Sequence, residues 1–319
     1  MSHTSSYHSA RSGFTLIELM ISLVLGLLIS AAVMQVYVIS ARTITVQQSA
    51  SEVQDSTIFA LQGLDDHIRI ANLGNPITNI TDITNHGGIV LTGNNIGDST
   101  YTGVGNLTKS ADSAGWTGLS NMDAVESDQL TIQYKNITPN SLYDCEGTEV
   151  TASSSNWVIE RYFVRLASSA SSGTGVQDLV LACDAGRVTA AGAVSDFGGN
   201  GVVIIPAVDQ FKVLLGAQTD VDNLTYLSAK DYLTLAKELA LEDKPVITTV
   251  KLGVIVRSST PLITDTDKED FTVLGSDQKL KTDSDRKKYY RRSYESTILL
   301  RNARVMSVTA VAANTTSSP

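Results

Sequence analysis

The residue with the clearest chemical consequence is Glu18, which lies inside a long apolar run. It is the only formally charged side chain between positions 14 and 40. An ionisable group inside an apolar span is costly, so a specific partner is expected. If the chain is cut after Gly13, the new α-amino group of Phe14 lies one helical turn from Glu18, and the carboxylate can neutralise that amine on an adjacent subunit. The alternative is a glutamate that reaches the membrane interface in an uncleaved anchor; position alone does not separate the two.

The segment before the apolar run is short, polar and carries Arg11, and Arg42 follows the run. An ordinary secretory signal has its apolar region before the cleavage site. Here the order is reversed. We therefore expect a leader, residues 1–13, to be removed, and residues 14–40 to remain as a helix long enough to cross a hydrocarbon core of about 30 Å.

The chain has two cysteines, Cys145 and Cys183. Beyond a membrane segment, in an oxidising compartment, they are natural partners for one disulfide. Closing that loop would restrict the unfolded chain by roughly 3–4 kcal/mol in the entropy model. The alternative is two separate buried thiols.

Other residues that could do chemistry give no catalytic pattern. Two histidines follow the leader, His67 and His86, and neither has a partner at metal-ligand spacing. His67 is expected to be a solvated or packing residue on a helix. No phosphate-cradling glycine loop, nucleophile elbow or metalloprotease motif is present in the sequence. We therefore expect no enzyme activity, no metal and no cofactor.

Two charged runs have alternative interpretations. The oxygens of Asp265, Asp267, Glu269 and Asp270 could hold calcium, but the EF-hand glycine and terminal glutamate are missing, so a solvated acidic loop is favoured. Residues 286–292 mix cations with aromatics, as a DNA-binding strand would. Local pairing with the preceding acidic stretch is favoured instead, and the net charge of −9 argues against a general nucleic-acid-coating surface.

The helix is expected to continue beyond the membrane. Apolar or small residues recur every three or four positions over residues 50–71, which predicts a narrow buried stripe. Residues 72–76, with one glycine and one proline, are a strong stop signal. The pattern predicts one helix over about 14–72, with an amphipathic continuation over residues 41–73. Ser22, Gly26 and Ser30 recur every four residues and could allow close helix approach, although chance gives such spacing too.

Strands dominate the remainder, residues 74–311, which we expect to form a head domain. Residues 74–127 show little periodicity and are predicted to be a long surface excursion with short strands, such as 88–91. Strand patterns cover residues 129–134, 157–166, 179–184, 202–205, 211–215, 248–257 and 296–305. Residues 228–241 have helical composition, and a tail, 312–319, is expected to be disordered. The predicted fold class is α+β: a long N-terminal helix packed on an antiparallel sheet.

The residues around the expected cut resemble a known signal. The sequence from Gly13 through Phe14 to Glu18 is similar to the type III signal of type IV prepilins and type II secretion pseudopilins. The resemblance implies that a membrane prepilin peptidase cuts after Gly13 and that the new terminal Phe14 is methylated. It also implies that Glu18, at the fifth mature position, guides entry into a filament.

A second resemblance lies near the C-terminus. Residues 289–304 and 250–258 and, more loosely, 208–213 are similar to the PilW family of minor pilins; most of residues 74–200 matches nothing recognised. The resemblance implies a minor pilin, related to J-type pseudopilins, that primes type IV pilus assembly in a tip complex. It implies as partners other minor pilins, the major pilin, prepilin peptidase and the inner-membrane assembly platform, with a tip adhesin as a further candidate.

The expected topology is a single inner-membrane pass with a periplasmic head, because the positively charged leader stays on the cytoplasmic side. Three alternatives stay open. One is a minor pseudopilin of a secretion or competence machine, which shares every N-terminal feature. Another is a membrane-anchored periplasmic binding or sensor domain that keeps its leader. The third is a periplasmic enzyme on a pilin stalk, which would need a polar cluster in the unmatched middle of the chain.

Overall fold

The computed structural model describes residues 13–168, 175–220, 223–264, 266–283 and 286–303. The chain divides into two compact units, residues 1–48 and residues 49–319. The predicted leader, except Gly13, and the predicted disordered tail lie outside the described residues.

The first element is a single helix, α1 (Leu16–Arg69), close to the predicted span of 14–72. Among the described residues it is the one helix long and apolar enough to cross a membrane. Its buried residues all lie in the second unit, where Val53, Leu64 and Ile68 form the predicted stripe. The stop signal also acts as predicted, since Asn72 has φ 66° and Gly74 has φ 77°, both left-handed conformations that end a helix.

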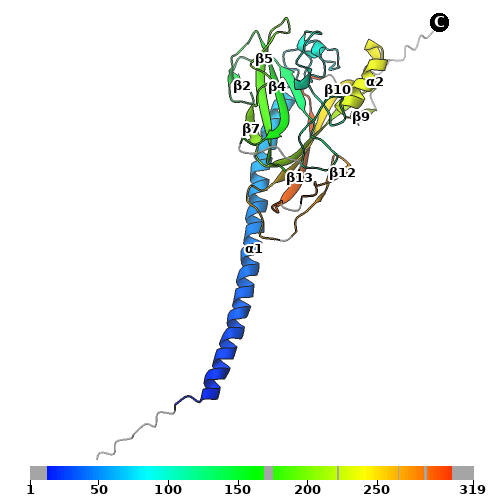
Figure 1. Cartoon of the computed structure of the whole chain (residues 1–319). Helices are drawn as coiled ribbons and strands as arrows, with labels where there is room; N and C mark the ends of the chain where they lie inside the picture. Colours follow the sequence, from blue (N-terminus) through cyan, green and yellow to red (C-terminus); the bar gives the residue numbers. More distant parts are fainter. Residues whose placement is uncertain (1–12, 169–174, 221–222, 265, 284–285, 304–319) are drawn as a thin grey trace, which may run out of the picture. The chain divides into compact units, whose positions relative to one another are not determined.

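The regular secondary structure in the rest of the second unit is mainly antiparallel strand (Figure 1). The longer strands are β1 (Leu130–Tyr134), β4 (Trp157–Leu166), β5 (Leu179–Val188), β8 (Val208–Gln218), β10 (Val246–Arg257) and β13 (Arg291–Leu299). The shorter strands are β2 (Leu142–Tyr143), β3 (Glu149–Val150), β6 (Val194–Ser195), β7 (Val202–Ile205), β9 (Leu224–Leu227), β11 (Asp270–Val273) and β12 (Ser276–Lys279). The remaining helices are α2 (Ala229–Glu238) and the 3₁₀ turns η1 (Gly93–Ile96), η2 (Val104–Asn106) and η3 (Leu241–Asp243).

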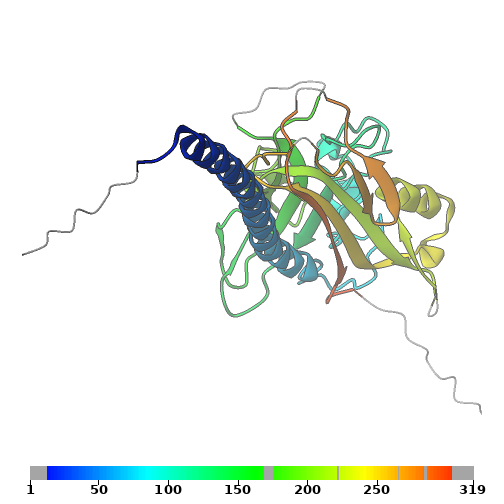
Figure 2. The ribbon, with the colours of Figure 1, turned by 90° about the horizontal axis from the view of Figure 1, so that it is seen from below.

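These strands form two main sheets rather than the one expected. One has the order β1-β4-β5-β6, with β7 also pairing with β5. The other has the order β13-β10-β8-β9. The pairs β11-β12 and β2-β3 are small hairpins. Figure 2 shows the second part of α1 beside the strands of both sheets.

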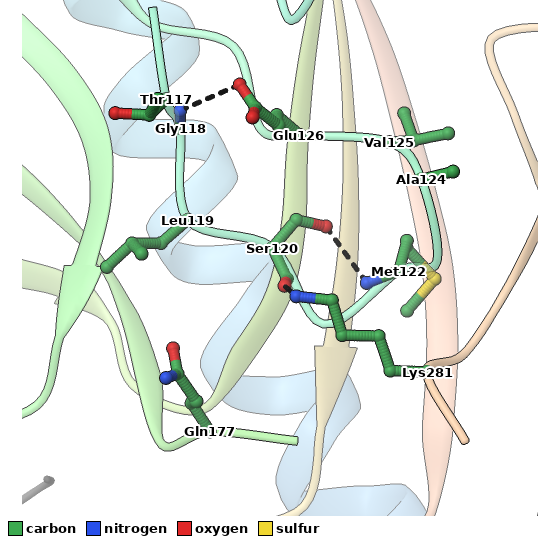
Figure 3. Close-up of a pocket in the computed structure, with 10 residues that line it drawn as sticks. All are labelled: Thr117, Gly118, Leu119, Ser120, Met122, Ala124, Val125, Glu126, Gln177 and Lys281. Carbon is green, nitrogen blue, oxygen red and sulfur yellow. Dashed lines mark hydrogen bonds between the residues drawn. The ribbon is translucent and has the colours of Figure 1, made fainter. Parts of the chain in front are cut away.

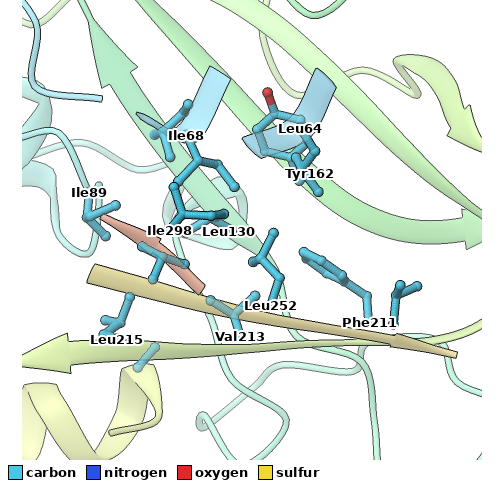
Figure 4. Packing of buried hydrophobic residues seen from close by; sticks show 14 of the residues in the cluster. Leu64, Ile68, Ile89, Leu130, Tyr162, Phe211, Val213, Leu215, Leu252 and Ile298 are labelled. Carbon is cyan, nitrogen blue, oxygen red and sulfur yellow. The ribbon is translucent and has the colours of Figure 1, made fainter. Parts of the chain in front are cut away.

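One core joins the helix to both sheets (Figure 4). Leu64 and Ile68 of α1 pack in the same cluster as Leu130 and Tyr162 of the first sheet. From the second sheet the cluster includes Phe211, Val213, Leu215, Leu252 and Ile298. All of these side chains are at least nine-tenths buried, so this half of α1 is an integral part of the head.

Two strand-level predictions were wrong. Residues 74–127 do not form a surface excursion, because Ile89, Val90, Ile96 and Leu107 are almost completely buried. The backbone of this segment pairs with strands only through single bridges, such as Ile89 with Ile132. Its sequence therefore lacks the alternating pattern of a strand, although these side chains pack inward. The last strand begins at Arg291 and ends at Leu299, earlier than the predicted 296–305, because its pairing with β10 sets the register.

Candidate functional site

The start of α1 is closed by a reciprocal pair of hydrogen bonds between Thr15 and Glu18. The backbone N–H and the hydroxyl of Thr15 each donate to Glu18 Oε2 at 2.9 Å. In return, the backbone N–H of Glu18 donates to the Thr15 hydroxyl at 3.3 Å. This is a capping box, in which a threonine just before the helix and a glutamate three residues later satisfy backbone donors that a helix leaves unpaired.

The expected processing residues lie immediately before this cap. Gly13 and Phe14 precede the first helical residue, and the Phe14 side chain is 85% exposed. Glu18 is exposed too, and in the first turn it lies where the helix dipole favours a negative charge. The apolar residues that follow are exposed as well, which fits a helix anchored in a membrane and taken up into a pilus.

A buried polar network joins the last turns of α1 to the head, centred on Glu160 of β4. The Glu160 carboxylate is completely buried. It accepts hydrogen bonds from the hydroxyls of Tyr134 and Tyr162, at 3.0 and 2.7 Å, and from the backbone N–H of Cys145 at 3.0 Å. Nδ1 of His67, on α1, lies 3.1–3.2 Å from both carboxylate oxygens.

The electrostatics of this network favour a protonated His67. Burial opposes the charge on His67, but the hydrogen bond and charge of Glu160, together with nearby carboxylates, outweigh it, so the pKa of His67 is raised above its ordinary value. Burial, followed by the charge of Glu160, raises the pKa of Tyr134 and of Tyr162, so both phenols stay protonated donors. The sequence had suggested that His67 is a solvated or packing residue. It is neither, because its ring is bonded to a buried carboxylate.

The predicted disulfide lies beside this network. Cys145 and Cys183 are bonded, with Cα atoms 6.2 Å apart, and no cysteine is left free. The one group of possible metal ligands among the described residues is this pair with Glu160. Both sulfurs are in the disulfide, and the Glu160 oxygens already accept hydrogen bonds from other donors. The three residues therefore stabilise the fold instead of offering free metal ligands.

Of the charged runs, the cationic one pairs within the chain. Arg286 donates to Asp267 at 2.7 Å and also contacts Glu269. Arg291 is completely buried and donates to Asp209 at 2.7 Å, with a second contact to Asp267. Local pairing within the cationic run is thus observed for Arg286 and Arg291. The Asp267 side chain is buried and held by them, so the prediction of a solvated acidic loop was wrong for Asp267, whereas Glu269 and Asp270 are exposed as predicted; Asp265 lies outside the described residues.

A hollow of about 380 Å³ in the head does not present a catalytic arrangement (Figure 3). It is lined mainly by the loop from Thr117 to Glu126, with Gln177 and Lys281. Lys281 Nζ donates to the Ser120 carbonyl at 2.8 Å, and Glu126 accepts from the backbone N–H of Gly118 at 3.2 Å. The Ser120 hydroxyl accepts from the N–H of Met122, and no lining residue shown is a histidine that could activate it.

Sequence reasoning missed two features of these sites. Thr15 and Glu18 have the spacing of a capping box, so the cap could have been predicted from the sequence. Glu160 is the one carboxylate in the strand pattern of residues 157–166, and a carboxylate there is a buried charge in need of a partner if its face of the strand is buried. Its donors come from positions 67, 134, 145 and 162, and only the fold brings them together.

Two protein-family models match the chain. Residues 8–34 match the prokaryotic N-terminal methylation motif, and residues 161–302 match type IV pilus-assembly protein W. Among solved structures, a type IV-like pilin from Thermus thermophilus is similar, with 12% identity and a TM-score of 0.32, covering 59% of this chain and 87% of that chain. No curated protein matches the chain.

Proposed function

We propose that this type IV pilin-like chain, which carries the N-terminal methylation motif and the pilus-assembly protein W match, is a minor pilin that primes pilus assembly within a tip complex. The protein performs no covalent chemistry itself in this role. Prepilin peptidase removes residues 1–13, and the mature chain begins at an N-methylated Phe14. The head then selects neighbouring pilins.

The observation that carries the proposal is the position of Glu18. It is the one charged side chain in the apolar part of α1, it lies at the fifth position after Gly13, and it falls within the matched motif. A carboxylate in an apolar helix needs a counter-charge. The α-amino group that cleavage exposes on the next subunit supplies one, so insertion into the filament is favoured for a cut chain.

In this proposal the uncut chain spans the inner membrane once, with its leader in the cytoplasm and its head in the periplasm. The positive charge of Arg11 on the inner side supports this orientation. Its partners are other minor pilins, the major pilin and the inner-membrane assembly platform. Contacts between successive, non-identical subunits are head-to-tail and therefore propagate instead of closing.

N-terminal mass spectrometry of the chain from cells with active prepilin peptidase tests the proposal. A mature terminus at N-methyl-Phe14 is expected. Intact Met1 or Ser2 in such cells would show an uncleaved anchor and defeat the minor-pilin assignment. For the priming role, deletion of the gene should reduce filament number while the remaining filaments keep normal length; unchanged filament number would remove that role.

A further inference from the structure

The contact between α1 and the first sheet contains Glu160, a buried carboxylate with several hydrogen-bond donors. An ionised carboxylate is acceptor-only and has about four lone-pair sites. Glu160 meets four donors: two phenols, one backbone N–H and the His67 imidazole. The network is thus built for the ionised form, and three of its donors are neutral. His67 is the one member that can bring a compensating positive charge.

Geometry makes His67 a member of this set that solvent can reach. Tyr134, Tyr162 and Cys145 belong to the head's strands and loops, whereas His67 belongs to the last turns of α1. Its side chain is 26% exposed, while that of Glu160 is fully buried. His67 also lines a cavity of about 190 Å³ that opens beside α1, with Phe59, Gly63 and Ile204 among the other lining residues. Protons can therefore reach His67 without the core opening.

The surroundings of His67 are dominated by negative charge. Asp66 precedes it on α1, Glu160 comes from β4, and Asp144 comes from the loop before β3. The positive charge of Arg187, on β5, is already paired with Asp144 at 2.7 Å. The charged groups facing the ring thus stabilise its protonated form.

We propose that His67 and Glu160 form a proton-operated clasp, which fastens the last turns of α1 to the head when His67 is protonated and loosens when it is neutral. In the protonated state the pair is a charge-assisted hydrogen bond, roughly twice as strong as a neutral one. In the neutral state the carboxylate stays buried with neutral donors alone, which is a less favourable arrangement. The clasp would tune how firmly the helix is held in the head, independently of whether the chain is a minor pilin.

The sign of the pH dependence follows from the raised pKa of His67. A raised folded-state value means that the stabilisation is fully present below about pH 6.5, the ordinary value, and is lost as pH rises through the folded-state value. His86 acts in the opposite direction, because burial lowers the pKa of His86 and its contribution to stability is lost as pH falls, not as pH rises.

Hydrogen–deuterium exchange of the full-length chain in detergent, at pH 6.0 and 8.5 and corrected for intrinsic rates, tests the clasp. Amide protection over residues 60–69 should fall by about tenfold between the two pH values, equivalent to about 1.4 kcal/mol. In His67→Gln the protection should change by less than twofold. The matched variant Asp66→Asn, which removes a neighbouring exposed charge, should keep most of the wild-type response. An equal pH response in His67→Gln and wild type, or no response in wild type, would overturn the proposal.

Discussion

Thr15 and Glu18 bond reciprocally at the start of α1, with two contacts of 2.9 Å to the same carboxylate oxygen. The carboxylate proposed for filament docking is therefore also the cap of its own helix. These two roles need different properties. The cap needs an oxygen that accepts hydrogen bonds, whereas neutralising an amine needs a negative charge.

Replacing Glu18 with Gln separates the two roles. The glutamine oxygen still accepts from Thr15, so the cap is kept, but the charge is gone. If Glu18 acts as the counter-charge to the amine of the next subunit, Glu18→Gln should reduce filament number nearly as much as Glu18→Ala. Filaments are counted by electron microscopy.

The processing step supplies the control for this pair. Both variants should still begin at Phe14 by mass spectrometry, because the scissile bond lies outside the helix. Normal piliation in Glu18→Gln together with few filaments in Glu18→Ala would assign Glu18 to capping and remove the docking role.

Gly63 on α1 offers a stabilising substitution. An added Cβ there meets no atom within 4 Å, and the residue lies on the exposed side of a helix interior. Alanine should raise the free energy of unfolding by about 0.5–1 kcal/mol, because it restricts the unfolded chain. Thermal unfolding of the full-length chain in detergent measures this.

Gly88 is the matched control for that alanine. A Cβ at Gly88 would lie 2.5 Å from the backbone nitrogen of Asn72, closer than real contacts allow. Gly88→Ala should therefore lower the melting temperature while Gly63→Ala raises it. A similar shift for both would mean that neither substitution acts through the local space described.

Features that depend on residues close together in the sequence were predicted well, and features that depend on distant residues were not. The helix, its stop at residues 72–76, and the strands at 157–166 and 202–205 depend on local periodicity and turn residues, so they were predicted closely. The division into two sheets depends on which strands pair. Pairing is decided by contacts between distant residues, which no single-sequence period records.

The same distinction applies to the sites. The bond between Cys145 and Cys183 was predictable because it uses the only two cysteines. Glu18 stands out because it breaks an apolar run, and its docking role stays a prediction. The partners of Glu160 and Asp209 could not be assigned. Each sequence neighbourhood shows a charge in a strand pattern, but the compensating groups lie far along the chain.

Removing the disulfide should destabilise the head strongly. The bond spans 38 residues, and Cys145 also donates its N–H to the buried Glu160, so loosening this loop disturbs the network. The double variant Cys145→Ser with Cys183→Ser should lose about 2–5 kcal/mol in the free energy of unfolding. A reductant should lower the melting temperature of the wild type and leave that of the double variant unchanged. Equal melting temperatures of the wild type and the double variant, both measured without reductant, would contradict the prediction.

Among the carboxylates that pair with the arginines of residues 286–292, Asp209 should be the one whose replacement lowers the free energy of unfolding most. It is completely buried, accepts from Arg291 at 2.7 Å and from Asn121 at 2.6 Å, and lies 3.6 Å from Arg257. Asp209→Asn removes the buried negative charge that Arg291 and Arg257 share, which leaves Arg291 with Asp267 and Arg257 with Asp178, so the cost should be about 3 kcal/mol, the lower end for breaking a buried pair. Asp178→Asn removes the other carboxylate that contacts Arg257, but Asp178 is 64% exposed, so solvent screens that pair and the cost should stay below about 1 kcal/mol. Denaturant unfolding of both variants compares one chemical change in two environments. Equal costs would show that burial of the Asp209 pair does not determine its contribution, and that residues 286–292 are held in place by something other than their ion pairs.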